Sequence, residues 1–120
     1  MGELRYFNLW EFDSPDLAGS GERMDRDFLQ KLDQARDKAG VSFSINSGYR
    51  TPDHNKKVGG KADSSHTRGL AVDIHAATSR KRYLILQALI EVGFHRIGIA
   101  KNFIHVDDDK QKPKEVAWLY

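Results

Sequence analysis

Apolar residues recur at intervals of three and four between about Met24 and Lys38, and this spacing predicts an amphipathic helix. The apolar stripe consists of Met24, Phe28, Leu29, Leu32, Ala35 and Ala39. Gly40 follows the stripe, and a glycine there readily takes the left-handed conformation that ends a helix. We therefore expect one helix with one buried face over this segment.

A second pattern of helical period runs from about Ser79 to Val92. Thr78 or Ser79 is expected to cap its start, and Gly93 to end it. Its apolar positions are Tyr83, Leu84, Leu86, Ala88 and Ile90. Because these positions cover a wide arc, we expect this helix to be mostly buried.

Apolar and polar residues alternate with a period of two in several short segments, and this alternation predicts β-strands. The segments are 41–47, 70–75, 96–100 and 103–107, and the tail 116–120 is expected to add an edge strand. In segment 70–75, Ala71, Asp73 and His75 share one face, because successive side chains of a strand point to opposite sides.

The third and fourth of these segments are separated by only two residues, which predicts a hairpin. In the register that this turn sets, Gly98 lies opposite His105, and Arg96 lies opposite Asp107. Since glycine has no side chain, we expect Gly98 to leave room for a metal and a substrate beside the imidazole of His105.

Together these elements predict an α+β fold, a small antiparallel sheet with two main helices packed against it. A short helix is expected to begin at Pro52, with Thr51 as its cap. Residues 1–23 are expected to form an extended arm and a loop whose aromatic residues pack on the body of the domain: Tyr6, Phe7, Trp10 and Phe12. A chain of 120 residues is long enough for one core, so we predict a single domain over residues 1–120.

Charge and composition narrow the function classes. The net charge of +2 is small, and Lys and Arg are scattered among Asp and Glu, so nucleic-acid binding has little support. The chain has no cysteine, so any metal must be held by histidine and carboxylate. No stretch approaches the roughly 20 apolar residues of a membrane span, and the start of the chain lacks the apolar core of a signal peptide.

Two imidazoles and one carboxylate stand out as candidate metal ligands: His66, Asp73 and His105. This set suits a zinc ion with its fourth position open, as in zinc sites that do chemistry. Gly69 lets the chain turn tightly between His66 and Asp73, so that both can reach one point. Each residue alone could be an ordinary polar side chain, but the three in these contexts favour a metal site.

The residues around these ligands resemble the M15 family of zinc peptidases. Residues 64–73 match Ser-x-His-x-x-Gly-x-Ala-x-Asp, and residues 105–107 match His-x-Asp. Segment 47–50, Ser-Gly-Tyr-Arg, and segment 55–60, Asn-Lys-Lys-Val-Gly-Gly, also resemble parts of that family. The similarity runs from about Met24 to Asp107, and it implies a fold like those of Hedgehog domains and D-Ala-D-Ala peptidases.

The resemblance implies roles for particular side chains. It places zinc on His66, Asp73 and His105, and it implies that Arg50 binds a carboxylate or carbonyl of a peptide substrate, a task that suits the guanidinium fork. Ser64 matches a family serine that contacts the substrate or supports the site. The alternatives are a surface arginine, or one paired with an acid such as Asp53, for Arg50, and a turn-forming serine for Ser64.

The implied reaction is metal-assisted hydrolysis, in which zinc lowers the pKa of bound water to about 7. A protein base then moves a proton from the water to the leaving amine. Many relatives carry an acid three residues before the last histidine ligand, but here that position is Asn102. We favour Asp107 as the base, although it could instead pair with Arg96 or orient an imidazole. His95 and His75 are the other candidates.

The leading hypothesis is a bare catalytic domain acting as a monomer on peptidoglycan stem peptides, either as a D-Ala-D-Ala carboxypeptidase or as an L-Ala-D-Glu endopeptidase. It would act in the periplasm or cell wall. The lack of a signal peptide fits a phage lysin released by a holin, a virion-associated enzyme, or an exported protein whose leader was trimmed. The alternative is a binding module that keeps zinc and has lost catalysis.

Overall fold

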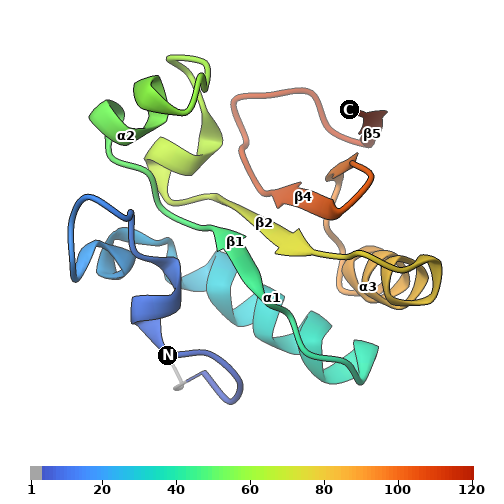
Figure 1. The fold of residues 1–120 in the computed structure, drawn as a ribbon. Helices are drawn as coiled ribbons and strands as arrows, with labels where there is room; N and C mark the ends of the chain where they lie inside the picture. Colours follow the sequence, from blue (N-terminus) through green and yellow to red (C-terminus); the bar gives the residue numbers. More distant parts are fainter. Residues whose placement is uncertain (1–3) are drawn as a thin grey trace.

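The computed structural model describes residues 4–120, and in it an α+β fold is built on a five-stranded sheet (Figure 1). The strands are β1 (Ile45–Ser47), β2 (Ala71–His75), β3 (Arg96–Ile99), β4 (Phe103–Asp107) and β5 (Val116–Leu119). They lie in the order β1-β2-β4-β3-β5. Strand β4 therefore lies at the centre of the sheet, with β2 on one side and β3 on the other.

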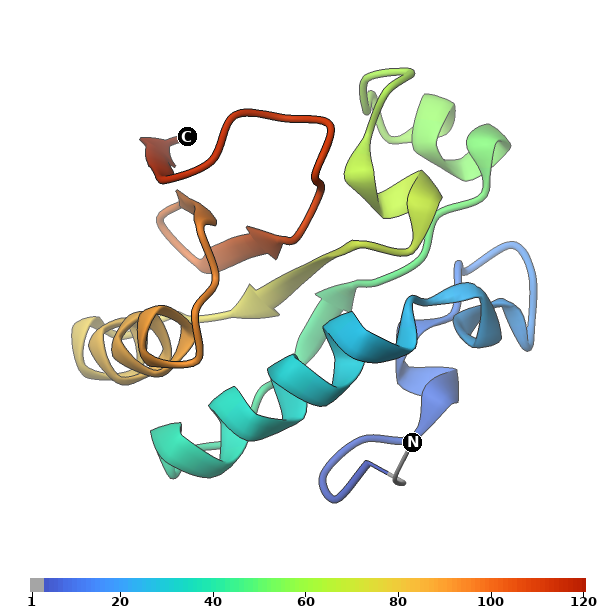
Figure 2. The ribbon, with the colours of Figure 1, turned by 180° about the vertical axis from the view of Figure 1, so that it is seen from behind.

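The first predicted helix forms α1 (Arg26–Ala39), which lies along one face of the sheet (Figure 2). Asp25 caps it by accepting a hydrogen bond from the backbone N–H of Phe28, so the helix begins two residues after the predicted start. Gly40 ends it with φ 69°, as predicted. The residues of the predicted stripe are all buried, which confirms the face that the spacing indicated.

The second predicted helix forms α3 (Ser79–Glu91), capped by Thr78, and it packs against α1 and β4. Its burial is narrower than predicted. Ile85, Ala88 and Leu89 are buried, whereas Tyr83 and Ile90 are 63% and 62% exposed. The prediction of a mostly buried helix is wrong because α3 has neighbours on only one side.

The sheet is mixed, which corrects the expectation of a purely antiparallel one. The hairpin register is as predicted, with Arg96 opposite Asp107 and Gly98 opposite His105. The tail does form an edge strand, but β5 pairs in parallel with β3. Strand β4 ends beside the start of β3, and the following loop stays at that end, so Val116 starts next to Arg96 and β5 must run in the direction of β3.

The period of two divides the sheet into an apolar and a polar face. One face contributes core residues that pack with α1 and α3: Val72, Ile74, Ile97, Ile104 and Val106. The other face carries Asp73 on β2 and His105 on β4. The helices thus cover one face, and the candidate ligands lie on the opposite one.

The segment before α1 is more regular than the predicted arm. It holds two 3-10 turns, η1 (Leu9–Phe12) and η2 (Ser20–Arg23). Phe7 and Phe12 are buried as expected, but Trp10 is 69% exposed. The first three residues of the predicted arm lie outside the described residues.

Three further elements complete the fold. Helix α2 (Pro52–Lys57) begins at Pro52 with Thr51 as its cap, as predicted. A 3-10 turn, η3 (Ser65–Arg68), precedes β2. The predicted strand over 41–47 is shortened to β1, which pairs only with β2. Across residues 4–120, no helix combines the length and the apolar character that crossing a membrane requires.

Candidate metal centre

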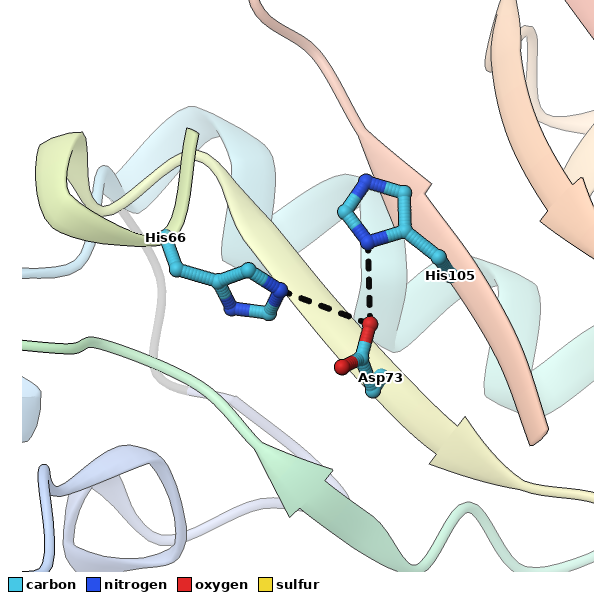
Figure 3. Close-up of side chains that lie close together, drawn as sticks. All are labelled: His66, Asp73 and His105. Atoms are coloured by element: carbon cyan, nitrogen blue, oxygen red, sulfur yellow. Dashed lines mark hydrogen bonds and ion pairs between the residues drawn. The ribbon is translucent and has the colours of Figure 1, made fainter. Parts of the chain in front are cut away.

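Three elements bring the candidate ligands to one point (Figure 3). Asp73 and His105 are direct partners across the β2–β4 pairing, so their side chains leave the same face of the sheet. His66 comes from η3, which Gly69 ends in the left-handed conformation at φ 71°. Gly69 therefore makes the turn that the sequence predicted, and the chain continues into β2.

The ligand atoms are close enough to share one ion. The Nδ1 of His105 lies 2.9 Å from the Oδ1 of Asp73, and the Nε2 of His66 lies 3.4 Å from the same oxygen. One atom from each of the three residues falls within 4.8 Å of the others. The histidines are 3% and 8% exposed, so the surrounding protein holds them in place.

A hydrogen-bond partner on the far side of each imidazole orients its ring toward Asp73. The carbonyl oxygen of Gly48 lies 2.8 Å from the Nδ1 of His66, and since a carbonyl only accepts, this nitrogen donates and Nε2 is bare. The Oδ2 of Asp107 lies 2.7 Å from the Nε2 of His105, and the Nδ1 of the same ring faces Asp73, so a carboxylate stands at each nitrogen of His105. The Nε2 of His66 and the Nδ1 of His105 thus both point toward Asp73.

Burial by itself would raise the pKa of Asp73, but its hydrogen bonds and charge interactions with the two imidazoles outweigh burial and hold its pKa well below the ordinary value. The ionised carboxylate and two ring nitrogens thus converge, and such a cluster needs a positive charge between its members. A proton on His105 can supply that charge. Burial lowers the pKa of His105, but the carboxylates of Asp73 and Asp107 outweigh burial and raise it.

A divalent cation is the other way to supply this charge, and metal binding displaces protons from such ligands. Two nitrogens and one carboxylate oxygen suit zinc, with partners behind each imidazole as in known zinc sites. The donor set and its orientation therefore fit a metal ion.

The cluster lies on the wall of a pocket of about 570 Å³. Arg50 lines this pocket, and its Nη2 atom is 3.5 Å from the Oδ2 of Asp73. Ser47 and Asn55 accept hydrogen bonds from its guanidinium at 3.0 and 3.3 Å, so the side chain is held at the edge of the cluster. The structure therefore brings Arg50 to the same pocket as the three candidate ligands, and away from a pairing with Asp53.

Ser64 also lines the pocket, two residues before His66. Its hydroxyl oxygen accepts a hydrogen bond from the backbone N–H of His66 at 3.3 Å and caps η3. Ser64 thus supports the turn that holds His66. Because it also lines the pocket, its side chain can contact a bound ligand as well.

Asp107 is 1% exposed, and both of its oxygens are already engaged. Oδ1 accepts from the Nε of Arg96 at 2.7 Å and from the backbone N–H of Asp109 at 3.1 Å, and Oδ2 faces His105. Burial opposes ionisation of Asp107, but its contacts with His105 and Arg96 outweigh burial and lower its pKa. The sequence allowed two roles for Asp107, a general base or a residue that pairs with Arg96 or orients an imidazole. The contacts match the second role.

The other candidate bases lie elsewhere. His95 lines a separate pocket with Lys31, Asp108 and Lys114, and His75 is exposed at the end of β2. Neither histidine is among the described residues that line the pocket of the metal cluster. Asn102 is exposed in the hairpin turn.

The role expected for Gly98 needs correction. A Cβ atom at this position would lie 2.5 Å from the Nε1 of Trp118, so the space beside Gly98 holds the indole ring. The ring of Trp118 packs on that of His105, with centroids 5.5 Å apart. Sequence reasoning missed Trp118 as a residue of the site. The alternation of side chains in the tail could be read from the sequence, but the parallel pairing that places Trp118 opposite Gly98 could not.

Asp109 is a second residue that sequence reasoning missed. It is 2% exposed and accepts a hydrogen bond from the Oγ of Ser65 at 2.6 Å, and it also pairs with Arg68. Ser65 and Arg68 are the ends of η3, so Asp109 ties the loop after β4 to the turn that carries His66. The aspartate run 107–109 was visible in the sequence, but its partners were not.

The sequence model of the family Peptidase M15 matches residues 12–107. The matched segment contains all three candidate ligands together with Arg50, Ser64 and Asp107. No curated protein gives a significant match.

Proposed function

Since the chain belongs to the Peptidase M15 family, we propose that it is a zinc-dependent peptidase that cleaves the stem peptides of peptidoglycan. The observation that carries the proposal is the convergence of two imidazole nitrogens and one carboxylate on the wall of a pocket. The cleaved bond is either D-Ala-D-Ala or L-Ala-D-Glu. Residues 1–120 act as one catalytic domain and as a monomer, at the cell wall or in the periplasm, from a phage-encoded or exported protein.

In this proposal His66, Asp73 and His105 hold zinc. Bound there, the ion would polarise the scissile carbonyl and make a water molecule a stronger nucleophile. Asp73 supplies the negative charge of the ligand set. The carbonyl of Gly48 holds the ring of His66 in the required orientation, and Asp107 does the same for His105.

Arg50 serves as the substrate clamp. Its guanidinium is fixed by Ser47 and Asn55 at the rim of the cluster, so a carboxylate or carbonyl of the peptide meets a donor that needs no reorganisation. Ser64 supports η3 and borders the same space, where its hydroxyl can also contact the peptide.

Asp107 is assigned to positioning, although it was the favoured base on sequence grounds. Its oxygens accept from Arg96, from the backbone of Asp109 and from His105, and a carboxylate held in this way has little freedom to take a proton from water. The charge of Asp107 instead makes His105 a stronger ligand.

A zinc-holding binding module is the second candidate function, and one observation favours it. Within residues 4–120, the carboxylates lining the pocket are Asp73 and Asp107, and both are engaged as described. Asn102 stands where many relatives carry an acid, and within the described part of the chain each oxygen of the carboxylates lining the pocket already has a partner.

One experiment separates the two functions. The zinc-loaded protein is incubated with purified peptidoglycan and with synthetic stem peptides, and new amino termini are quantified. A peptidase releases new termini, and this release stops after chelation of zinc and in His66→Ala. Full zinc occupancy with binding but no cleavage of any stem peptide would establish the binding module instead.

A further inference from the structure

Strand β5 adds an aromatic surface to the pocket from outside the family-matched segment. The family match ends at residue 107, whereas β5 begins at Val116. Trp118 and Tyr120 line the pocket, and Leu119 between them does not. Tyr120 directly follows β5, so the period of two of the extended chain sends alternate side chains into the pocket.

The indole ring of Trp118 is held in place by its neighbours. Its ring packs on His105 at a centroid distance of 5.5 Å, and the guanidinium of Arg96 lies 5.0 Å from the centre of the indole. Gly98 lies beneath it, where any Cβ would collide with the ring. The indole is therefore fixed directly beside a candidate metal ligand.

Tyr120 extends this surface outward. Its ring lies 6.5 Å from that of Trp118 and 5.1 Å from that of Phe103, and Tyr120 is 67% exposed. We call Phe103, Trp118 and Tyr120 the aromatic wall. In Figure 1, β5 and the segment after α2 lie apart from each other, with parts of β2 and β4 between and below them.

The facing side of the pocket is formed by segment 58–61, Val-Gly-Gly-Lys. Much of the remaining lining is charged: Arg50, Lys61, Asp73, Arg96, Asp107 and Lys112. An apolar group of a substrate thus gains most from contact with the aromatic wall, while its carboxylate or carbonyl is drawn to Arg50.

We propose that Trp118 and Tyr120 are specificity-determining residues that contact a small apolar side chain of the peptide residue next to the cleaved bond. This inference rests on the proposed function, because it names what the same pocket selects. The aromatic faces offer an apolar surface beside the cluster, and Arg50, which lines the same pocket, offers donors to a carboxylate or carbonyl of the peptide. A glycine at that peptide position leaves the wall uncovered, so it binds more weakly.

A purely structural role for β5 makes a different prediction. In that case Trp118 and Tyr120 only cover the edge of β3, and their removal lowers the stability of the fold without changing which peptide is preferred. Preference between two peptides is therefore the informative quantity, and stability alone is not.

The test uses stem peptides whose scissile amide is replaced by a methyleneamine, so that binding is measured without turnover. Each is made with alanine and with glycine at the position before the replaced bond, for both candidate bonds. Calorimetry on zinc-loaded protein measures both affinities. We expect the alanine peptide to bind about tenfold more tightly, the lower end of what one apolar group contributes in a pocket.

The variants are Trp118→Ala and Tyr120→Ala, with Leu119→Ala as matched control on the same strand. We expect the two aromatic variants to reduce the preference below about twofold, while zinc content stays at one per chain and Leu119→Ala keeps the preference. Trp118→Phe is included in case the alanine variant fails to fold, and Tyr120 is exposed enough that its variant tests the wall independently.

A second readout uses the two tryptophans of the chain. Trp10 is 69% exposed and does not line the pocket. In Trp10→Phe, all tryptophan fluorescence therefore comes from Trp118. Saturation with the alanine peptide should change its fluorescence, and the glycine peptide should change it less.

An unchanged preference in both aromatic variants, or no response of Trp118 at saturation, overturns the inference, as does failure of every peptide to bind. If the protein prefers the alanine peptide but cleaves no natural peptide, the role of the aromatic wall is supported and the peptidase function is rejected. If the protein cleaves peptides and the aromatic variants keep the preference, only the role of the aromatic wall is rejected.

Discussion

His105 and Asp107 lie two residues apart on the same face of β4, and the Nε2 of His105 is 2.7 Å from the Oδ2 of Asp107. This contact leaves the Nδ1 of His105 to face Asp73 at 2.9 Å. The ring orientation that the cluster needs is thus set from within one strand, and Arg96 on the neighbouring strand holds Asp107 in turn.

Asp107→Asn should weaken zinc binding, because it removes the negative charge behind His105. We expect a loss of about tenfold to a hundredfold in zinc affinity, as for other changes of partners behind a ligand. Competition with a chromophoric chelator measures this affinity, with Asp108→Asn as the neighbouring control. Unchanged zinc affinity with abolished turnover would return Asp107 to the role of base.

Replacing a ligand should remove the metal altogether. His66→Ala and His105→Ala should lose zinc that survives gel filtration, as measured by elemental analysis, together with activity. His75→Ala is the matched control, since His75 shares a strand face with Asp73 but is exposed and borders no part of the pocket. Retention of one zinc per chain in His66→Ala would contradict the assigned ligand set.

Arg50→Lys should impair the handling of the substrate more than the binding of the metal. Lysine keeps the charge but loses the planar fork that Ser47 and Asn55 hold in place. A hydrogen bond to a charged group contributes about 1.5–3 kcal/mol, so kcat/KM should fall roughly tenfold to a hundredfold while zinc affinity stays constant. Arg80→Lys on the exposed side of α3 serves as control, and an equal effect there would argue against a clamp.

Asp109 should make stability depend on pH. Burial opposes its ionisation, but hydrogen bonds from Ser65 and Arg68 outweigh burial and lower the pKa of Asp109 below its ordinary value. A lowered folded-state pKa stabilises the fold above the unfolded value of about 3.9, and this stabilisation is lost as pH falls through the folded pKa.

Asp109→Asn should therefore cost about 1–3 kcal/mol at neutral pH, and its stability should fall less steeply with acid than that of the parent. Urea unfolding of the zinc-free proteins between pH 7 and 3 measures both effects. Parallel pH profiles for parent and variant would contradict the assignment.

Gly98→Ala should disturb β5, because the added Cβ would meet the indole of Trp118 at 2.5 Å and the ring of Tyr120 at 2.7 Å. Overpacking of this kind typically costs about 1–3 kcal/mol. The cost should shrink in the background of Trp118→Ala, and a double-mutant cycle of unfolding free energies measures that coupling. Additive effects would show that the two positions do not compete for space.

The alternation of residues in the two ligand-bearing strands was enough to predict much of the site. It placed Asp73 and His105 on one face, and the turn at 101–102 set the pairing of Gly98 with His105, since side-chain direction in a strand follows from backbone geometry alone. Local capping was equally readable at Thr51 and Gly40, where the side chain or the absence of one acts on its own neighbours.

The tertiary structure decided what depends on partners far along the chain. Strand β5 runs parallel to β3 because the preceding loop stays at one end of the sheet, and this alone puts Trp118 into the space beside Gly98. Tyr83 is exposed because α3 has a neighbour on one side only. The sequence by itself determined which residues share a face, whereas packing between distant segments determined which faces are covered and what each polar group meets.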